Sequence, residues 1–405
     1  MHNGRATVVI AFAEALSAPE VAWSLLDAGF NVTSIARRGR GSALRHSRKV
    51  DCHEICPPEQ DMAQALREMV SVLNSIGDRQ PRPTLLFPLD DTALWMCSEL
   101  APNDTWIQVG PNKASVNLAL NKQQQIRLAC EAGFKVPEAG VATSVDQALA
   151  LGEQIGFPLV LKPVECTSVR NGRKIGRKTR ICANASEFKA ALQEWNETIP
   201  VLLQKYIVGV GEGIFGLATP DGVQSWSAHR RLRMMNPHGS GASACVSIPV
   251  DEGVRQKTEA LIGMAKWTGL FMVELLRDKS GEAWFVELNG RPWGSMALAR
   301  RQGLEYPAWS ASMTLAPGSH VEKTKSGSAG LVCRNLGREI MYLLFVLRGP
   351  RSAAMVEWPS IWKALRTILQ TSRSERYYNW RRDDKGVFFA DCFYTLRDNL
   401  FKAGG

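Results

Sequence analysis

The sequence lacks several features that mark disulfide-rich, membrane or dinucleotide-binding proteins. Its nine cysteines are odd in number and form no CxxC pair, so a reducing compartment, the cytoplasm, is the simpler location. Outside the N-terminus, the longest apolar run is the eight residues 340–347, far short of the roughly 20 that a spanning helix needs. The turn after the first apolar segment, residues 14–17, carries no GxGxxG, which disfavours a dinucleotide-binding role.

Two local patterns imitate sites that their surroundings do not support. Cys52, His53 and Cys56 carry zinc-ligating atoms, but a fourth ligand would have to come from elsewhere, so a zinc site is disfavoured. Residues 5–18 resemble a signal peptide, yet Glu14 interrupts the apolar part too early. A first β-strand is expected there instead.

Ordinary apolar content and an excess of positive charge are what the sequence does have. Its 405 residues, 45% hydrophobic and 22% charged, predict two or three globular domains. The formal net charge of +10 suits nucleic acid, an anionic membrane or a small anionic ligand such as a nucleotide. Residues 331–405 alone hold 13 lysines and arginines against seven acids.

The order of apolar segments predicts the fold class. In the first 113 residues, apolar strands alternate with helical patterns, which is typical of a doubly wound, Rossmann-like α/β sheet. The expected strands are 7–13, 31–36 and 84–89, and the expected helices are 19–30, 57–76 and 92–100, the last after an Asp90-Asp91 cap.

Residues 114–318 follow a different pattern and predict an α+β domain. A helix is expected over 114–132 and a strand over 157–163, with hairpin turns at 221–222 and 279–281. A segment rich in Gly, Ser and Lys then leads into a small, mainly helical region, 319–405, with helices at 338–347 and 359–370. Its interleaved aromatic and basic residues permit contact with nucleic acid or an anionic bilayer, but such helices more often pack on the preceding domain.

The most informative segment, residues 271–294, predicts a β-hairpin with two opposed carboxylates. With a loop over 279–282, Asp278 pairs with Ala283. The same register places Glu274 directly opposite Glu287.

The second strand of this hairpin predicts a site for a hard cation. Because side chains alternate along a strand, Phe285, Glu287 and Asn289 are expected on one face. Two acids and an amide together are costly unless a cation neutralises them, and oxygen ligands suit Mg²⁺ or Mn²⁺ rather than zinc. The alternative is a solvated sheet face beside Arg291.

These residues carry a resemblance to a known family. Glu274, the run FVELNGRPWGS at 285–295 and GLEYP at 303–307 resemble the metal-binding end of ATP-grasp enzymes, and most closely the carboxylate–amine ligase branch. Gly290 stands where that family more often has proline. Further segments follow the family's order: 121–122 with 133–137, 157–163, 203–209 with Glu212, and 229–233 with 239–243.

The resemblance covers about residues 1–315 and implies a role for each matching residue. It predicts a pre-ATP-grasp domain over 1–113, an ATP-grasp domain over 114–318 with the ATP and metal site between its lobes, and an accessory region over 319–405. ATP would be bound by Lys122, Lys162, Gln204, Tyr206, Ile207 and Glu212, and the metal by Glu274, Glu287 and Asn289. The catalytic residues would be Arg231, Arg233 and Arg291, since guanidinium groups bind phosphoryl and carboxylate oxygens.

A run of six basic residues between Arg170 and Arg180, with Gly172 and Gly176 and no acid, is expected to form the family's mobile lid over the phosphates. Its charge exceeds what phosphate binding needs and would also suit an acidic substrate or a polyanion. A solvated hairpin is the alternative.

The resemblance implies an ATP- and Mg²⁺-dependent ligase that joins a small-molecule carboxylate to an amine through an acyl-phosphate, with release of ADP and phosphate. Two alternatives stay open. One is another ATP-grasp reaction, of the carbamoyl-phosphate or kinase-like type. The other is a nucleotide-sensing protein whose basic tail contacts nucleic acid or membrane. Homo-oligomer formation is not decided by the sequence.

Overall fold

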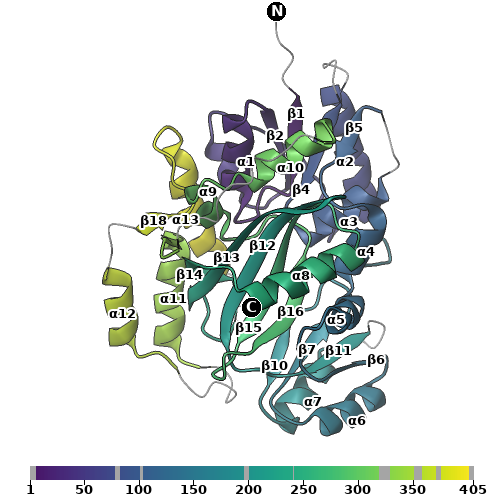
Figure 1. Ribbon diagram of the computed structural model, residues 1–405, viewed down its shortest axis with the longest axis vertical. Helices are drawn as coiled ribbons and strands as arrows, with labels where there is room; N and C mark the ends of the chain where they lie inside the picture. The colour runs from purple at the N-terminus through teal and green to yellow at the C-terminus, as the bar shows by residue number, and fades with distance from the viewer. Residues whose placement is uncertain are drawn as a thin grey trace, which may run out of the picture.

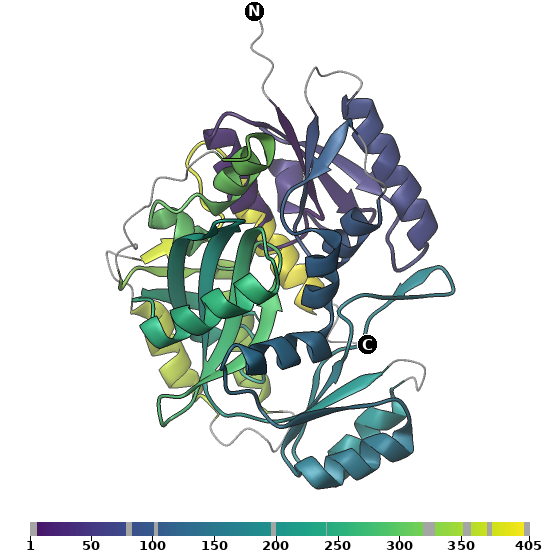
Figure 2. The same cartoon turned by 45° about the vertical axis from the view of Figure 1, so that its right-hand side comes forward.

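The computed structural model shows four β-sheets, three of which follow one another along the molecule's long axis (Figure 1). It describes residues 6–77, 83–100, 104–195, 200–239, 241–318, 329–350, 358–370 and 375–400. A five-stranded sheet lies at the end near the N-terminus, a seven-stranded sheet occupies the middle, and a four-stranded sheet with α6 and α7 lies at the far end (Figure 1). Figure 2 shows the small fourth sheet, a two-stranded hairpin, extending from the far end toward the first sheet.

The first sheet is entirely parallel, which confirms the parallel arrangement predicted for this part of the chain. Its strands, in spatial order, are β3 (Asp51–Ile55), β2 (Asn31–Arg37), β1 (Thr7–Ala11), β4 (Thr84–Pro88) and β5 (Trp106–Gln108). The helices are α1 (Ala18–Asp27), α2 (Met62–Gly77) and α3 (Asp91–Glu99), with a 3-10 turn at Ala43–His46. The sequence does not predict β3, because this polar edge strand has no apolar run.

The helix predicted over 114–132 is two helices, α4 (Lys113–Leu120) and α5 (Lys122–Glu131). Asn121 breaks the chain between them, since its backbone is extended and its side chain accepts a hydrogen bond from the Gln124 amide at 3.0 Å. Lys122 therefore stands at the first position of a new helix, where the Val164 carbonyl accepts its backbone N–H at 2.8 Å.

The four-stranded sheet is antiparallel and is covered by two helices. Its strands are β10 (Arg180–Cys182), β7 (Leu159–Pro163), β11 (Val201–Lys205) and β6 (Ala139–Ala142), and its helices are α6 (Val145–Ile155) and α7 (Ala185–Gln193). A separate hairpin of β8 (Ser168–Arg170) and β9 (Arg173–Ile175) turns at Asn171 and Gly172, whose φ angles are 48° and 71°.

The seven-stranded sheet holds the predicted carboxylate hairpin at one edge. Its strands are β16 (Ala283–Asn289), β15 (Gly269–Arg277), β12 (Val210–Thr219), β13 (Gly222–Met234), β14 (Ala242–Ile248), β17 (Val332–Arg334) and β18 (Glu375–Tyr377). Helices α8 (Glu252–Met264), α9 (Met296–Arg301) and α10 (Tyr306–Leu315) pack nearby. All neighbouring strands are antiparallel except β17 and β18.

The C-terminal region continues this central sheet. Strands β17 and β18 extend it past the boundary predicted after residue 318, and helices α11 (Leu336–Arg348) and α13 (Lys385–Leu400) pack against each other beside it. Helix α12 (Ile361–Leu369) confirms the other predicted helix. In the described part of the chain, none of the helices combines the length and apolar character of a membrane span. Contact of this region with nucleic acid or membrane stays a prediction.

A buried ion pair ties α11 to the central sheet. Arg233 of β13 donates from Nε to both carboxylate oxygens of Glu339, at 3.1 and 3.0 Å, and the Glu339 side chain is only 2% exposed. Loss of one partner leaves an uncompensated buried charge, which is costly.

We therefore expect Glu339→Ala to lower the free energy of unfolding by about 3 kcal/mol. Urea denaturation followed by circular dichroism measures this change. Glu252→Ala, which removes an exposed pair with Arg255, is the control and should leave the unfolding midpoint unchanged. An equally small effect of both substitutions would contradict a structural role for the Arg233–Glu339 pair.

Candidate active site

The two acids of the β15–β16 hairpin face each other as predicted, although the register near the turn differs. Glu274 pairs with Glu287. At the turn, Arg277 rather than Asp278 pairs with Ala283, so the predicted pairing there is wrong. One unpaired residue of β16 forms a β-bulge between the two stretches and shifts the register by one. The predicted register is wrong by one residue at the turn, and the bulge shifts the observed register back by one. The predicted pairing of Glu274 with Glu287 is therefore correct.

The bulge at Val286 also decides which side chains share a face. Phe285 packs in the apolar core with Leu288, whereas Glu287 and Asn289 line a pocket on the opposite side. The prediction that Phe285 shares their face is therefore wrong, because the bulge reverses the alternation of side chains. Asn289 Nδ2 donates a hydrogen bond to Glu287 Oε1 at 3.1 Å.

Arg231 of β13 neutralises one of the two acids. Its Nη2 lies 2.6 Å from Glu274 Oε1, with the two side chains 15% and 17% exposed. Burial disfavours the charged guanidinium, but Glu274 outweighs it and raises the pKa of Arg231 above its ordinary value. Arg231, Glu274, Glu287, Asn289 and Arg291 together line a cavity of about 150 Å³.

Arg291 links this cavity to the first sheet. Its Nε donates to Asp91 Oδ1 at 2.7 Å, and Asp91 begins helix α3 just after strand β4. Burial opposes ionisation of both groups. Their mutual attraction and hydrogen bond outweigh burial, so the pKa of Asp91 falls and the pKa of Arg291 rises. Both side chains therefore stay charged.

Two lysines approach the same carboxylates from other elements. Lys162 of β7 donates from Nζ to Gln204 Oε1 of β11 at 3.0 Å. Burial lowers the pKa of Lys162, and Glu287 only partly opposes this. Lys122 Nζ lies 2.9 Å from Cys166 Sγ, and although burial lowers the pKa of Lys122, Cys166 and Glu287 raise it overall.

A larger cavity, of about 860 Å³, lies between the four-stranded and seven-stranded sheets. Lys162, Gln204, Tyr206 and Ile207 line it from the four-stranded sheet and the chain after β11. Val286 and its neighbours line it from the hairpin strands. The structure thus brings these four predicted residues together beside the predicted metal ligands.

Glu212 is not placed as predicted. It lies inside strand β12 rather than on a flexible turn, and it is 3% exposed. Its Oε1 accepts from Arg230 Nε at 2.8 Å and its Oε2 from Arg277 Nε at 2.7 Å. Glu212 pairs with Leu275, the neighbour of Glu274, so it points to the other side of the sheet.

Arg233 also points away from the site. Arg231 pairs with Cys245, but a bulge at Leu232 pairs Arg233 with the adjacent Ala244. Adjacent residues of a strand face opposite sides, so Arg231 and Arg233 diverge despite their spacing of two. Arg233 instead forms the ion pair with helix α11.

The sequence does not predict several residues that line the small cavity: His229, Ser295, Arg338 and Tyr378. Arg338 and Tyr378 come from the C-terminal region and carry no local signal. Asp91, which binds Arg291, could have been found from the sequence. It follows a parallel strand, and the ligands of such sheets bind at the carboxyl ends of the strands.

The basic hairpin β8–β9 contacts the first sheet's unit. The Gly172 carbonyl accepts from the Met62 amide at 2.7 Å, and the Lys174 amide donates to the Pro58 carbonyl at 2.8 Å. Lys174 Nζ lies 3.6 Å from Glu59. The predicted lid is therefore a hairpin that bridges two units of the molecule; its action on phosphates stays a prediction.

The donor set around Glu287 suits a hard cation. Glu274, Glu287 and Asn289 offer two carboxylates and an amide oxygen, the ligands that Mg²⁺ takes together with phosphate oxygens and water. Among the residues described, no group of three or more His, Cys, Asp or Glu side chains is placed to hold a metal, so a fully protein-enclosed centre is not present there.

The site thus consists of a cavity between two antiparallel sheets with an acid-paired hairpin at its wall. A scan against models of known protein families finds no match. The chain is nevertheless similar in sequence to carbamoyl phosphate synthase large chains, and in fold to a biotin carboxylase and an N5-carboxyaminoimidazole ribonucleotide synthetase.

The similar sequences include carbamoyl phosphate synthase large chains. The N-terminal section from Aquifex aeolicus is 26% identical over 313 residues, which are 72% of this chain and 54% of that protein. The large chain from Thermotoga petrophila is 25% identical over 231 residues, 54% of this chain and 20% of that protein. The chain thus spans between a fifth and about half of these relatives.

Solved structures of similar fold include a biotin carboxylase from Campylobacter jejuni, with a TM-score of 0.60, 14% identity, and coverage of 80% of this chain and 74% of that one. An L-amino acid ligase from Bacillus licheniformis has a TM-score of 0.57, 16% identity, and coverage of 81% and 78%. At these identities the likeness concerns the fold alone.

His229 offers a test of the site's electrostatics. It is buried, its Nδ1 lies 2.6 Å from Ser295 Oγ, and burial, helped by Arg231, lowers its pKa from 6.5 to about 3. Between these pH values the unfolded chain binds a proton that the folded protein does not, so His229 makes folding less favourable as the pH falls below 6.5.

We expect the wild type to lose about 2 kcal/mol more stability than His229→Asn between pH 7.5 and pH 5.0. Urea titrations at the two pH values measure the difference. Ser295→Ala keeps the buried imidazole and should keep the wild-type pH dependence. Equal losses in the wild type and His229→Asn would show that the imidazole is protonated in the folded protein.

Proposed function

We propose that the protein is an ATP- and Mg²⁺-dependent carboxylate–amine ligase that forms an amide or peptide bond through an acyl-phosphate. The observation that carries this proposal is the pairing of Glu274 with Glu287 across the hairpin, beside Asn289 and within the electrostatic reach of Lys122 and Lys162. Opposed carboxylates beside lysines suit a metal–triphosphate complex.

Each residue of the site has a place in this proposal. Gln204, Tyr206 and Ile207 would form the adenine end of the 860 Å³ cavity, and Lys162 and Lys122 would bind phosphate oxygens. The metal would be held by Glu274, Glu287 and Asn289, and when bound it would draw charge from the transferring phosphoryl group. Glu212 and Arg233 have no part in the proposal.

The two steps would depend on positioning and electrostatics. A substrate carboxylate oxygen attacks the γ-phosphorus, the bond to the β-phosphate oxygen breaks, and ADP leaves. The amine nitrogen then attacks the acyl carbon, the bond to the phosphate oxygen breaks, and phosphate leaves as the nitrogen loses a proton. Arg231 and Arg291 would stabilise the negative charge on the acyl-phosphate, since both line the cavity beside the acids.

The proposal includes the division of the chain into units over 1–113 and 114–318, with residues 319–405 completing the second. It also includes a cytoplasmic location and, as an open question for sedimentation, a homo-oligomer; one structurally similar biotin carboxylase domain was solved as a dimer.

A second candidate is a carbamoyl-phosphate-type reaction, in which bicarbonate is the carboxylate and ammonia the amine. The sequence similarity to carbamoyl phosphate synthases favours it. ADP release that needs only bicarbonate and ammonia would identify this reaction. An acyl-phosphate trapped by hydroxylamine with an organic acid would identify the first candidate.

We expect Glu287→Gln to lower ADP release at least 100-fold, because the change removes a carboxylate from the metal site and keeps its shape. A coupled ADP assay with a panel of carboxylic acids and amines measures this. Glu282→Gln, at the turn of the same hairpin and paired with Lys135 at 3.0 Å, is the matched control and should keep wild-type rates.

Two results would overturn the proposal. One is unchanged turnover in Glu287→Gln. The other is release of AMP and pyrophosphate in place of ADP and phosphate, because an adenylate rather than an acyl-phosphate would then be the intermediate.

A further inference from the structure

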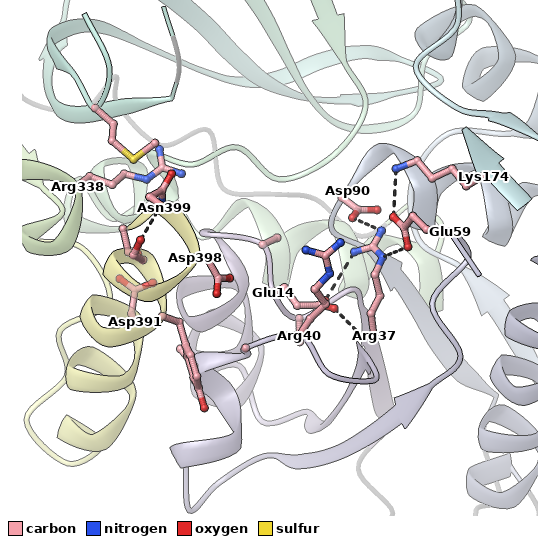
Figure 3. Close-up of a pocket in the computed structure, with 17 residues that line it drawn as sticks. Glu14, Arg37, Arg40, Glu59, Asp90, Lys174, Arg338, Asp391, Asp398 and Asn399 are labelled. Atoms are coloured by element: carbon pink, nitrogen blue, oxygen red, sulfur yellow. Dashed lines mark hydrogen bonds and ion pairs between the residues drawn. The ribbon is translucent and has the colours of Figure 1, made fainter. Parts of the chain in front are cut away.

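A third cavity, of about 460 Å³, opens between the first sheet and the C-terminal helix α13. One wall carries Glu14, Arg37 and Arg40, and α13 forms the opposite wall with Asp391 and Asp398 (Figure 3). Nothing in the steps described above uses this cavity.

The charges on the first wall are balanced. Arg37 Nη2 lies 2.7 Å from Asp90 Oδ2, its Nη1 lies 3.8 Å from Glu14, and its Nε lies 3.7 Å from Glu59. Three acids therefore surround Arg37, and Arg40 and Lys174 bring the bases to three as well. With the opposite wall included, a phosphate or other polyanion would meet five acids and four bases, whereas a ligand with no net charge would not be repelled.

Several polar groups of this wall lack hydrogen bonds, although Arg37 lies within ion-pair distance of Glu14 and Glu59. Arg37 is 7% exposed, and among the described residues its Nε has no hydrogen-bond acceptor. Glu14 Oε2 and Glu59 Oε2 are likewise buried without a hydrogen-bond donor in that part of the chain. Arg40, which rises from the same segment after β2, has no ion-pair partner among the described side chains. Buried polar groups are normally paired, so unpaired ones facing a cavity indicate a ligand.

The unpaired groups define what such a ligand must carry. The Arg40 guanidinium has no ion-pair partner among the described side chains and Arg37 Nε has no hydrogen bond there, and a carboxylate has the planar geometry that matches both. Glu14 Oε2 and Glu59 Oε2 lie near Arg37 but accept no hydrogen bond in that part of the chain, and an ammonium group can donate one to each. A small molecule that carries both a carboxylate and an ammonium group, and therefore no net charge, can form hydrogen bonds with all of these side chains.

We propose that this cavity binds an amino acid as a zwitterion and that the amino acid is the amine substrate of the ligase. The second clause rests on the proposed function. A carboxylate held by arginines of the first sheet is kept away from Glu274 and Glu287, so this substrate offers its nitrogen rather than its carboxylate.

Two connections link the cavity to the carboxylate site. Arg338 lines both cavities, so they meet at its side chain. Asp90 binds Arg37 of the amino-acid cavity, and its neighbour Asp91 binds Arg291 of the carboxylate site. The two cavities therefore adjoin each other at Arg338 and through the neighbouring residues Asp90 and Asp91. Burial raises the pKa of Glu14, which favours its uptake of a proton from a bound ammonium.

The test is calorimetric titration of the full-length protein with each of the twenty standard amino acids. For the tightest binder, its N-acetyl derivative and its carboxamide are titrated as well, so that each charge is removed in turn. We expect both derivatives to bind at least tenfold more weakly than the amino acid. We expect Arg40→Gln to weaken the amino acid at least tenfold and to leave ATP binding unchanged.

Arg38→Gln is the matched control, because Arg38 is two residues away but pairs with Glu68 at 3.0 Å outside the cavity. It should bind the amino acid like the wild type. Glu14→Gln is a second test. We expect this variant to bind the amino acid and its N-acetyl derivative with similar affinity.

The inference is overturned if the blocked derivatives bind as tightly as the amino acid, or if Arg40→Gln binds it like the wild type. It is also overturned if no amino acid binds at about 10 mM. ADP release with another acid and amine would then leave the ligase proposal standing. Amino-acid binding with the expected dependence on Arg40, but without ADP release, would refute the ligase and keep the cavity's assignment.

Discussion

Two carboxylates face each other across one β-hairpin, and the rest of the site is arranged to supply the positive charge that they need. Glu274 and Glu287 repel each other unless positive charge surrounds them, and that charge comes from four elements far apart in the sequence: Arg231 of β13, Arg291 after β16, Lys162 of β7 and Lys122 of α5. The cavity between the two antiparallel sheets lies where these elements converge. Metal and phosphate would then add one cation and several anions to a set in which four bases face two acids.

Much of this arrangement could be predicted from the sequence, because period-two alternation, loop signals and the order of motifs are local properties. The parallel sheet, the Glu274–Glu287 pair and the positions of Lys162 and Gln204 followed from them. The errors concern β-bulges. At Val286 a bulge moved Phe285 to the core, and at Leu232 another turned Arg233 toward α11. A bulge depends on how a strand pairs with its neighbours in the sheet, so it cannot be predicted from the sequence of that strand alone.

Long-range partners were the second limit. Glu212 reads as a loop acid between two glycines, yet β12 pairs on both sides and two arginines occupy its oxygens. From the sequence, Arg338 is one more charge of a basic tail, yet in the structure it lines two cavities. Part of the positive charge of the C-terminal region therefore belongs to the site. The net charge of +10 thus combines basic residues with different roles.

Strands β17 and β18 lie at the end of the central sheet, and Tyr378, directly after β18, lines the cavity that holds Glu274 and Glu287. During synthesis both acids leave the ribosome about a hundred residues before the wall that encloses them does. A nascent chain therefore passes through a stage in which both acids have been made but the wall formed by Tyr378 has not. Synthesis through β18 to Tyr378 is thus a condition for a closed site.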